Sequence, residues 1–362
     1  MIDVDRARVL AYRVAAHQFD GAGGSPPVLS LGVQDTPYGS AALALAARRA
    51  TPDDSLSLVW STRGAPHLHR TADLPALAAA LWPMSDADAS TRIATGAIKD
   101  GAKLGIAAFT ATATAINKIL AGRTSPIRKG ELSGQVSARI PEPLTYWCKV
   151  CQSRHISGAL LQQAGLPGGA RLLVAGQATS FVPIDGWPGV PENATGTDAV
   201  VSAYLRLLGP ATPADAAKFL GTSQTAARPA WPNGLAEVLI DGRSAWLPAD
   251  RIEALRAAPT PRLVRLLPPS DPFLQARDRM LLLPDKSRHK ALWGVLGNPG
   301  ALLVGGEIVG TWRVRKAGKT DVEVRVTPFE RLASDTRRCV EDEARRVGDV
   351  RQASDVRVTI DS

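Results

Sequence analysis

Three residues of metal-binding type lie close together in the middle of the chain. They are Cys148, Cys151 and His155, in a Cys-x2-Cys-x3-His pattern that uses two of the three cysteines of the sequence. Thiolates and imidazoles suit zinc, and this spacing is typical of half a zinc site. A closed structural site needs a fourth ligand, and no Cys or His follows at a usual spacing, so one interpretation is an open three-ligand site. The alternative is two half-buried cysteines at the end of a helix.

A second candidate is the histidine pair His67 and His69, which follows the basic turn at Arg63. On a strand the two imidazoles point to one face and Leu68 to the other. Together with Arg63 they could contact a nucleic acid, or they could bind a metal, although no third ligand lies near in sequence. The alternative is a solvated strand edge.

Basic residues outnumber acidic ones. The 362 residues include 43 Lys and Arg against 34 Asp and Glu, and the net charge of +9 favours a polyanionic partner through counterion release. Trp312 and Trp293 could stack on a base, but core packing is the alternative for both, and a solvated face is the alternative for any single Arg. Further candidates for DNA contact are Arg128, Lys129, Arg228, Arg277, Arg279, Trp312 and Arg313.

Several classes of protein are disfavoured by motifs that the sequence lacks. It has no Gly-rich phosphate loop ending in Lys-Ser/Thr, no Gly-x-Ser-x-Gly and no His-Glu-x-x-His, which argues against nucleotide-driven and esterase chemistry. It also has no apolar run of about 18 residues and no signal-peptide pattern, and three cysteines make no disulfide framework. We therefore expect a cytoplasmic protein without a membrane partner.

The elements that must position these residues repeat one plan three times: helices, then a two-stranded hairpin. The third copy is the clearest, because Asp241-Gly242 is a strong hairpin turn signal and capping residues mark its helices. Helix, helix, helix, hairpin is the plan of a winged helix. The predicted elements of this copy are helices over 197–208 and 213–220, a short helix from 223, and strands over 237–240 and 244–247.

The other two copies are less regular. In the first, the alternation of Leu56, Leu58 and Trp60 predicts a strand whose partner carries Leu68. After about residue 260 the pattern changes to strands and turns, and the residues beyond 346 are expected to be loosely ordered. The remaining predicted elements are helices over 98–120, 128–136, 144–149 and 330–346 and strands over 172–174 and 181–182.

The sequence therefore predicts an α+β protein made of three tandem winged-helix modules and a small β-rich C-terminal domain. The modules are expected at 1–80, 95–185 and 197–258, and the β-rich domain, with its C-terminal helix, at 260–362.

Two C-terminal segments carry a family resemblance. The first is Leu267–Leu274, with two Pro-containing turns, followed by Arg277-Asp278-Arg279. The second is Gly305–Arg313, where a Gly-Gly turn leads to a Trp-Arg pair. Together with the wing over 63–69, these segments resemble the winged-helix DNA-binding family that includes the AlkZ-like DNA glycosylases. The resemblance is strongest over 30–70 and 262–315, covers nearly the whole chain, and implies a curved basic surface for duplex DNA.

The same resemblance suggests a role for Gln34, Asp35 and Thr36. Glycosylases of that family have Gln at the position of Gln34 and a second Gln or an Asp two residues later, where this chain has Thr36. One group positions a water, and the other stabilises the oxocarbenium-like charge that develops as the base leaves. In an extended segment Asp35 points away from Gln34, and a short hydroxyl cannot replace an amide. The alternative is a turn and helix start without catalytic role.

These observations leave three functions open. The first is a glycosylase that hydrolyses the N-glycosidic bond of an alkylated purine, with Gln34 positioning water and Asp35 stabilising charge by default. The second is an architectural or regulatory DNA-binding protein that kept the fold and lost the chemistry. The third is a protein-interaction module, which the excess of Lys and Arg over Asp and Glu disfavours. For the first two we expect a monomer associated with the nucleoid and bound to double-stranded DNA, without a cofactor unless Cys148, Cys151 and His155 hold zinc.

Overall fold

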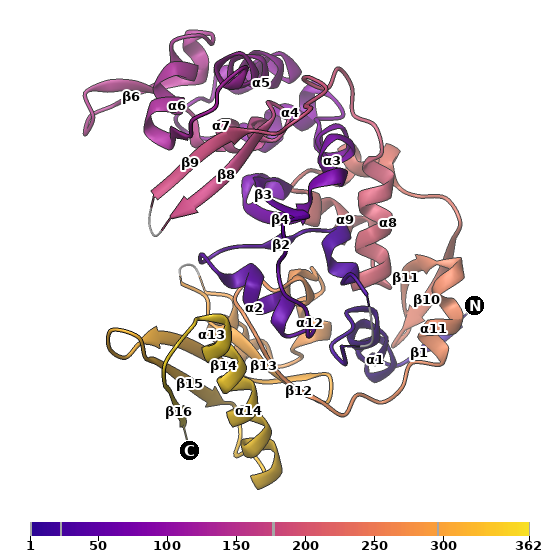
Figure 1. Cartoon of the computed structure of the whole chain (residues 1–362). Coiled ribbons are helices and arrows are strands. Elements are labelled where there is room, and N and C mark those ends of the chain that lie inside the picture. Colours follow the sequence, from indigo (N-terminus) through magenta and orange to yellow (C-terminus); the bar gives the residue numbers. More distant parts are fainter. Residues whose placement is uncertain (1, 22–23, 176–177, 295–296, 362) are drawn as a thin grey trace. The chain divides into compact units, whose positions relative to one another are not determined.

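The computed structural model describes residues 2–21, 24–175, 178–294 and 297–361. The chain divides into two compact units, each made of separate stretches (Figure 1). The first unit contains residues 1–53, 203–212 and 233–362, and the second contains residues 54–202 and 213–232. Helix α8 (Thr197–Leu208) contributes residues to both. Helices and strands are both abundant, so the predicted α+β class is confirmed.

The first unit contains a three-stranded sheet in the order β1-β10-β11 and a five-stranded sheet in the order β12-β13-β14-β15-β16. Its strands are β1 (Ile2–Val4), β2 (Val33–Gln34), β10 (Leu235–Ile240), β11 (Arg243–Pro248), β12 (Val264–Leu267), β13 (Gly300–Val304), β14 (Glu307–Lys316), β15 (Val322–Pro328) and β16 (Val356–Ile360). Its helices are α1 (Arg6–Ala16), α2 (Ser40–Ala46), α11 (Ile252–Arg256), α12 (Arg279–Leu282), α13 (His289–Leu292) and α14 (Ser334–Val350).

The three-stranded sheet joins the amino-terminal strand to the β10–β11 hairpin. Strands β10 and β11 form the antiparallel hairpin predicted from Asp241-Gly242, and Asp241 and Gly242 both have positive φ, as this tight turn requires. Strand β1 pairs in parallel with β10, with Ile2 opposite Val238. Helix α1 packs on this sheet through Val9 and Tyr12, which share a core with α11.

The five-stranded sheet is the β-rich part predicted after residue 260. Four strands pair antiparallel in sequence order, and β16 then pairs in parallel with β15, with Val322 opposite Val356. Helix α14 covers one face, because Val340, Ala344 and Val347 share a core with the sheet (Figure 1). The expectation of a loosely ordered end was wrong: Val356, Val358 and Ile360 alternate as a strand and pack against that core.

The second unit is mostly helical. Its helices are α3 (Leu74–Leu81), α4 (Asp86–Ile93), α5 (Ile106–Leu120), α6 (Lys129–Ser137), α7 (Gly158–Gly165), α9 (Pro213–Leu220) and α10 (Gln224–Ala227). Its strands are β3 (Leu56–Trp60), β4 (Pro66–Arg70), β5 (Ile127–Arg128), β6 (Thr145–Cys148), β7 (Ser153–Ile156), β8 (Ala170–Ala175) and β9 (Ala178–Pro183). One apolar core unites most of them, from β3 and α4 to α7, β8 and β9, and in it the rings of Trp60 and Phe181 lie 4.8 Å apart.

One predicted helix of the second unit is a strand. Residues 144–149 were expected to be helical, but Thr145–Cys148 forms β6, which pairs antiparallel with β7. Threonine, tyrosine and tryptophan in succession favour extended backbone, and the pairing with β7 adds the hydrogen bonds that a four-residue helix could not supply. This corrects the surroundings of Cys148, which ends a strand and not a helix.

The first unit is held at its centre by a buried ion pair between Arg48, just after α2, and Asp271. Both side chains are fully buried, and the guanidinium donates to both carboxylate oxygens at 2.8 and 2.9 Å. Asp271 also accepts from the backbone N–H of Phe273 and so caps the 3-10 turn Pro272–Gln275. The Arg48 guanidinium lies 4.4 Å from the centre of the Phe19 ring. One ion pair therefore fixes the 3-10 turn against α2.

We expect Asp271→Ala to lower the free energy of unfolding by about 3–5 kcal/mol, because it leaves the guanidinium of Arg48 buried without its counter-charge. Denaturant unfolding of the full chain, followed by circular dichroism, measures the change. Asp285→Ala is the matched control: Asp285 caps another 3-10 turn but is exposed, and its loss should cost much less. Equal losses in the two variants would contradict the assigned role of the buried pair.

Candidate functional site

The candidate catalytic segment lies between β2 and α2 in the first unit. Gln34 ends β2 and is half-buried, whereas Thr36 is exposed. The carboxylate of Asp35 turns to the start of α2, where it accepts from the backbone N–H of Ala41 at 2.9 Å. Burial raises the pKa of Asp35, and hydrogen bonds from backbone N–H groups of α2 oppose this shift. Asp35 thus fits the alternative in which this segment forms a turn and the start of a helix. Its carboxylate nevertheless lies only one residue from Gln34 in the sequence.

A second glutamine approaches Gln34 from a distant part of the sequence. Gln275 ends the 3-10 turn that Asp271 caps, and its Nε2 lies 3.5 Å from Oε1 of Gln34. The same Nε2 donates to the backbone carbonyl of Ser270 at 3.4 Å. Sequence analysis missed Gln275. The only available signal was its place directly after the Leu267–Leu274 motif, because the 241 positions that separate it from Gln34 are bridged only in the folded unit.

Arg277 extends this polar row. Its guanidinium donates to Oε1 of Gln275 at 3.5 Å, and its backbone N–H donates to the hydroxyl of Tyr204 at 3.3 Å. The predicted DNA-contact residue Arg277 is therefore half-buried beside Gln275. The row Gln34–Gln275–Arg277 fixes the amide of Gln275 with its oxygen toward Arg277 and its nitrogen toward Gln34.

A basic cleft of about 740 Å³ begins at the same loop. Pro37 and Tyr38 line one part of it, and Tyr38 is exposed. The predicted DNA-contact residue Arg313 is exposed and lines the cleft, and it donates to the carbonyl of Gly297 at 2.7 Å. The cationic residues that line the cleft are Arg313, Arg315, Lys316, Arg325 and Arg351.

Trp312 lies next to this cleft, but its ring belongs to the core. It is 2% exposed, and its indole N–H donates to the carbonyl of Leu267 at 2.7 Å. The ring lies over Gly300, where an added Cβ would come within 2.2 Å of Nε1. The prediction that Trp312 stacks on a base was therefore wrong, and the alternative of core packing holds. Trp293 is half-buried beneath the exposed Arg279, whose guanidinium lies 4.9 Å from a ring centre of Trp293.

The other predicted DNA-contact residues belong to the second unit. Arg128, Lys129 and Arg228 are exposed, with Arg128 and Lys129 at the start of α6 and Arg228 directly after α10. Arg63 is half-buried and donates to the backbone carbonyl of Phe219, whose ring centre lies 5.5 Å from the guanidinium. Arg63 therefore joins the β3–β4 connection to α9.

His67 and His69 face one side of β4, as predicted, but both are buried. His69 Nε2 lies 2.9 Å from the hydroxyl of Ser61, and His67 Nδ1 lies 2.9 Å from the carbonyl of Ala65. The solvated-edge alternative was wrong, and buried rings offer no edge to DNA. Burial lowers the pKa of His67 to about 4 and that of His69 to about 3. Within the described residues no third metal-ligating side chain groups with them.

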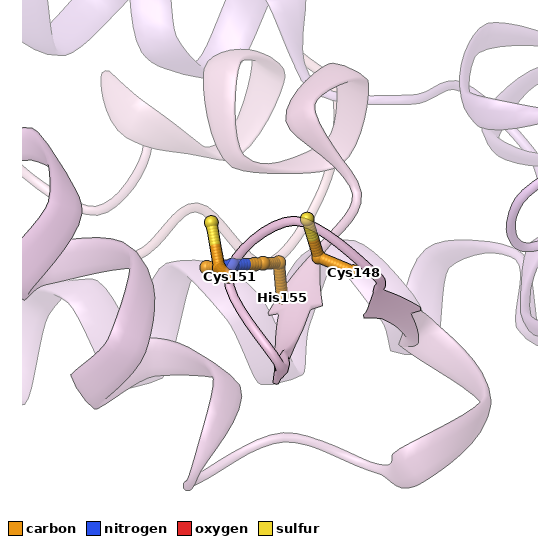
Figure 2. A group of neighbouring side chains, drawn as sticks. All are labelled: Cys148, Cys151 and His155. Atoms are coloured by element: carbon orange, nitrogen blue, oxygen red, sulfur yellow. The ribbon is translucent and has the colours of Figure 1, made fainter.

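Cys148, Cys151 and His155 do come together, on the β6–β7 hairpin (Figure 2). Their potential ligand atoms all lie within 4.8 Å of one another. Backbone N–H groups of Cys151 and Val150 donate to the Cys148 sulfur and lower the pKa of that thiol, whereas the hydrogen bond to Cys148 raises the pKa of Cys151. The hairpin thus brings together the three residues that the sequence spacing grouped.

Comparison with known families identifies the family of the chain. A family model described as DNA glycosylase AlkZ-like matches residues 28–350, a range that contains the Gln34 loop, Gln275 and the residues that line the basic cleft other than Arg351. The chain belongs to the AlkZ-like DNA glycosylase family. The resemblance predicted from the Leu267–Leu274 and Gly305–Arg313 segments is therefore confirmed, and with it a DNA glycosylase-like protein of DNA repair.

A solved structure of this glycosylase family has the same fold. DNA glycosylase AlkZ from Streptomyces sahachiroi is similar with a TM-score of 0.73 over 99% of this chain and 100% of that chain, at 22% sequence identity. At this identity the likeness shows a shared fold. No curated protein matches. None of the helices in the described ranges is long and apolar enough to span a membrane.

The buried histidines predict how the stability of this AlkZ-like chain depends on pH. In the folded protein the pKa values of His67 and His69 lie below the usual value of 6.5. The unfolded state therefore binds more protons than the folded state below that pH. Stability should be full above about pH 6.5 and fall as the pH drops toward the folded pKa values, by about 2 kcal/mol per histidine at pH 5. Denaturant unfolding at pH 7.5 and 5.0 measures the difference.

Asparagine at both positions (H67N/H69N) should remove the share of this acid sensitivity that the two rings contribute, because asparagine does not titrate. Buried His17, whose pKa burial also lowers, should keep its own share. His289→Asn, at a half-buried histidine of the first unit, is the control and should retain the acid sensitivity of the unaltered protein. If H67N/H69N loses stability between pH 7.5 and 5.0 as steeply as the unaltered protein, the two buried rings are not its cause.

Proposed function

We propose that the chain is an active DNA glycosylase that hydrolyses the N-glycosidic bond of N-alkylated purines in duplex DNA. Membership of the AlkZ-like family supports the reaction class. The observation that carries the proposal is the approach of Gln275 to Gln34, with 3.5 Å between Nε2 and Oε1. This contact brings an amide to the catalytic loop of a chain that has only a threonine hydroxyl two residues after Gln34.

In the proposed reaction, the bond between C1′ and N9 breaks and its electron pair passes to the cationic alkylated base, which leaves neutral. A water bonds to C1′ and loses its proton to solvent. Oε1 of Gln34 accepts a hydrogen bond from this water and so aims its oxygen at C1′. Asp35, whose carboxylate is held by the start of α2, contributes only its charge from that position to the stabilisation of the oxocarbenium-like carbon.

Gln275 acts in this scheme as a positioning residue. Its Nε2 holds Oε1 of Gln34 in one orientation, and Arg277 holds the amide of Gln275 in turn. A carbonyl oxygen has two lone pairs, so Oε1 of Gln34 can accept from Gln275 and from the water together. Thr36, being exposed, then needs no catalytic role.

DNA would lie with its phosphates along the basic cleft next to Tyr38. The lining cations are spread over β14, β15 and the end of α14, which is the pattern of a backbone-contact surface without base readout. In the same proposal the three helix-and-hairpin segments act as winged-helix modules, Arg128, Lys129 and Arg228 add phosphate contacts, and the protein works as a monomer on the nucleoid.

A second candidate function is DNA binding without excision. It rests on Thr36, which supplies no amide, and on the engagement of Asp35 by the start of α2. Under that alternative the cleft binds duplex DNA and the Gln34–Gln275 pair has only a structural role.

The catalytic proposal predicts that Gln34→Ala slows excision of N7-methylguanine from a duplex oligonucleotide by about 100- to 1000-fold, the loss typical of removing one transition-state hydrogen bond. Gln275→Ala should lower kcat by about tenfold and leave KM unchanged, because it only loosens Gln34. Thr36→Gln should leave the rate near that of the unaltered protein, because in this scheme Gln275 already supplies the second amide. Single-turnover base release measures these changes, and DNA affinity should stay constant throughout.

Gln135→Ala is the matched control, because Gln135 is a helical glutamine of the second unit that contacts Glu131. An unaltered protein that binds DNA but releases no alkylated base would support the second candidate. Excision that survives Gln34→Ala would refute the proposed chemistry, and excision lost on Asp35→Asn alone would make Asp35 the dominant group.

The DNA-binding proposal predicts an affinity that falls by orders of magnitude between about 50 and 200 mM salt, with little sequence preference. Charge reversal of Arg313 and Lys316 should weaken binding to an undamaged duplex much more than reversal of Arg338 and Arg345. The latter pair is exposed on α14 and engaged only with acidic residues three positions away. Fluorescence anisotropy at several salt concentrations decides this, and equal losses for the two pairs would exclude the cleft as the binding surface.

A further inference from the structure

The β6–β7 hairpin has no role in the proposed glycosylase chemistry. It is a two-stranded sheet, with Tyr146 opposite His155 and Cys148 opposite Ser153. Its base is anchored, because Ile156 is buried in the core and the backbone N–H of Ile156 donates to the hydroxyl of Ser137 at 2.8 Å. Its far end carries exposed apolar side chains, with Trp147 55% and Val150 91% exposed. A two-stranded hairpin without a third strand is marginally stable in water, so its tip needs another restraint.

The tip brings together three good ligands for a soft divalent ion. Cys148 ends β6, Cys151 lies in the connecting loop and His155 lies on β7, and all three side chains meet beside that loop (Figure 2). Their ligand atoms lie within 4.8 Å of one another. Tetrahedral zinc would need them about 3.5–3.8 Å apart, so small side-chain rotations suffice to close the site.

The loop is shaped as a metal-binding turn without help from an ion. Gln152 has a positive φ of 50°, and its side chain donates to the carbonyl of Lys149 at 2.6 Å. Backbone N–H groups of Val150 and Cys151 point at the sulfur of Cys148. Such donors stabilise a metal-bound thiolate, because they offset the negative charge of the sulfur. The hydroxyl of Ser153 lies 3.2 Å from His155 Nε2 and restrains the ring.

We propose that Cys148, Cys151 and His155 bind one zinc ion, with a solvent molecule as fourth ligand, and that this ion braces the tip of the β6–β7 hairpin. Thiolate, thiolate and imidazole form a donor set that prefers zinc to magnesium or calcium. Among the described residues no other group of His, Cys, Asp and Glu side chains is close enough to hold an ion. The fourth position is therefore open to solvent.

The role of the ion is structural. The cluster lies on the tip of a hairpin, and no residue of the Gln34–Gln275 row belongs to it. Zinc ties the end of β6 to β7 across the loop, which limits the excursions of Trp147 and Val150. Because the base of the hairpin is anchored separately in the core, the second unit should fold without the ion.

The test is cobalt titration of the chelator-treated full chain under reducing conditions, in which cobalt reports on thiolate coordination by its absorption. The expected result is saturation at about one cobalt per chain, with sulfur-to-metal charge-transfer bands and tetrahedral d–d bands that zinc abolishes. Cys151→Ser should remove most of the charge-transfer intensity and His155→Asn should weaken binding at least tenfold. Cys339→Ser, which changes the remaining cysteine, an exposed residue of α14, should leave both unchanged.

Melting curves separate loss of the site from loss of the fold. Cys151→Ser and His155→Asn should melt at the temperature of the metal-free protein, whereas zinc should raise the melting temperature of the unaltered protein only. Absence of cobalt binding at micromolar metal, or binding that survives Cys151→Ser, would overturn the proposal. So would a Cys148–Cys151 disulfide found by mass spectrometry after purification with reductant.

Discussion

The arrangement of the first unit depends on the ion pair between Arg48 and Asp271. Two buried charges are tolerated here because they pair with each other and because backbone groups supply further hydrogen bonds. Arg48 also donates to the carbonyl of Ala44, and Asp271 accepts from the backbone N–H of Phe273. The pair ties the end of α2 to the turn that carries Gln275, while the start of α2 holds Asp35. One helix of seven residues thereby sets the spacing between two loops that lie far apart in sequence.

The sequence predicted the local elements better than their surroundings. Helix α9 begins at Pro213 and ends at Leu220, as the capping residues indicated, and the β10–β11 hairpin turns at Asp241-Gly242. Failures came where a partner outside the element decides the outcome. Thr145–Cys148 is extended because β7 pairs with it, Val356–Ile360 is ordered because β15 pairs with it, and Trp312 is buried because Gly300 leaves room for its ring. In each case the residues of the element alone do not reveal the partner.

The candidate site shows the same division. Gln34 was found through the family resemblance, and the Cys148, Cys151 and His155 group was found because its spacing within a few residues carries the signal. Gln275 was missed because only the folded first unit brings it to Gln34, and sequence patterns report neighbours within one element. The histidine pair was assigned to the correct face of a strand, yet its burial follows from packing that alternation alone does not reveal.

The interleaved units bear on how this chain is synthesised. All residues of the second unit have been synthesised once position 232 is made, but the first unit needs residues 203–212 and 233–362 as well as the first 53. Strand β1 has no sheet to join until β10 emerges more than 200 residues later. The apolar face of α1 therefore stays exposed to solvent while the second unit forms its own core. During that interval the nascent chain is prone to aggregation, and we expect chaperones to bind it.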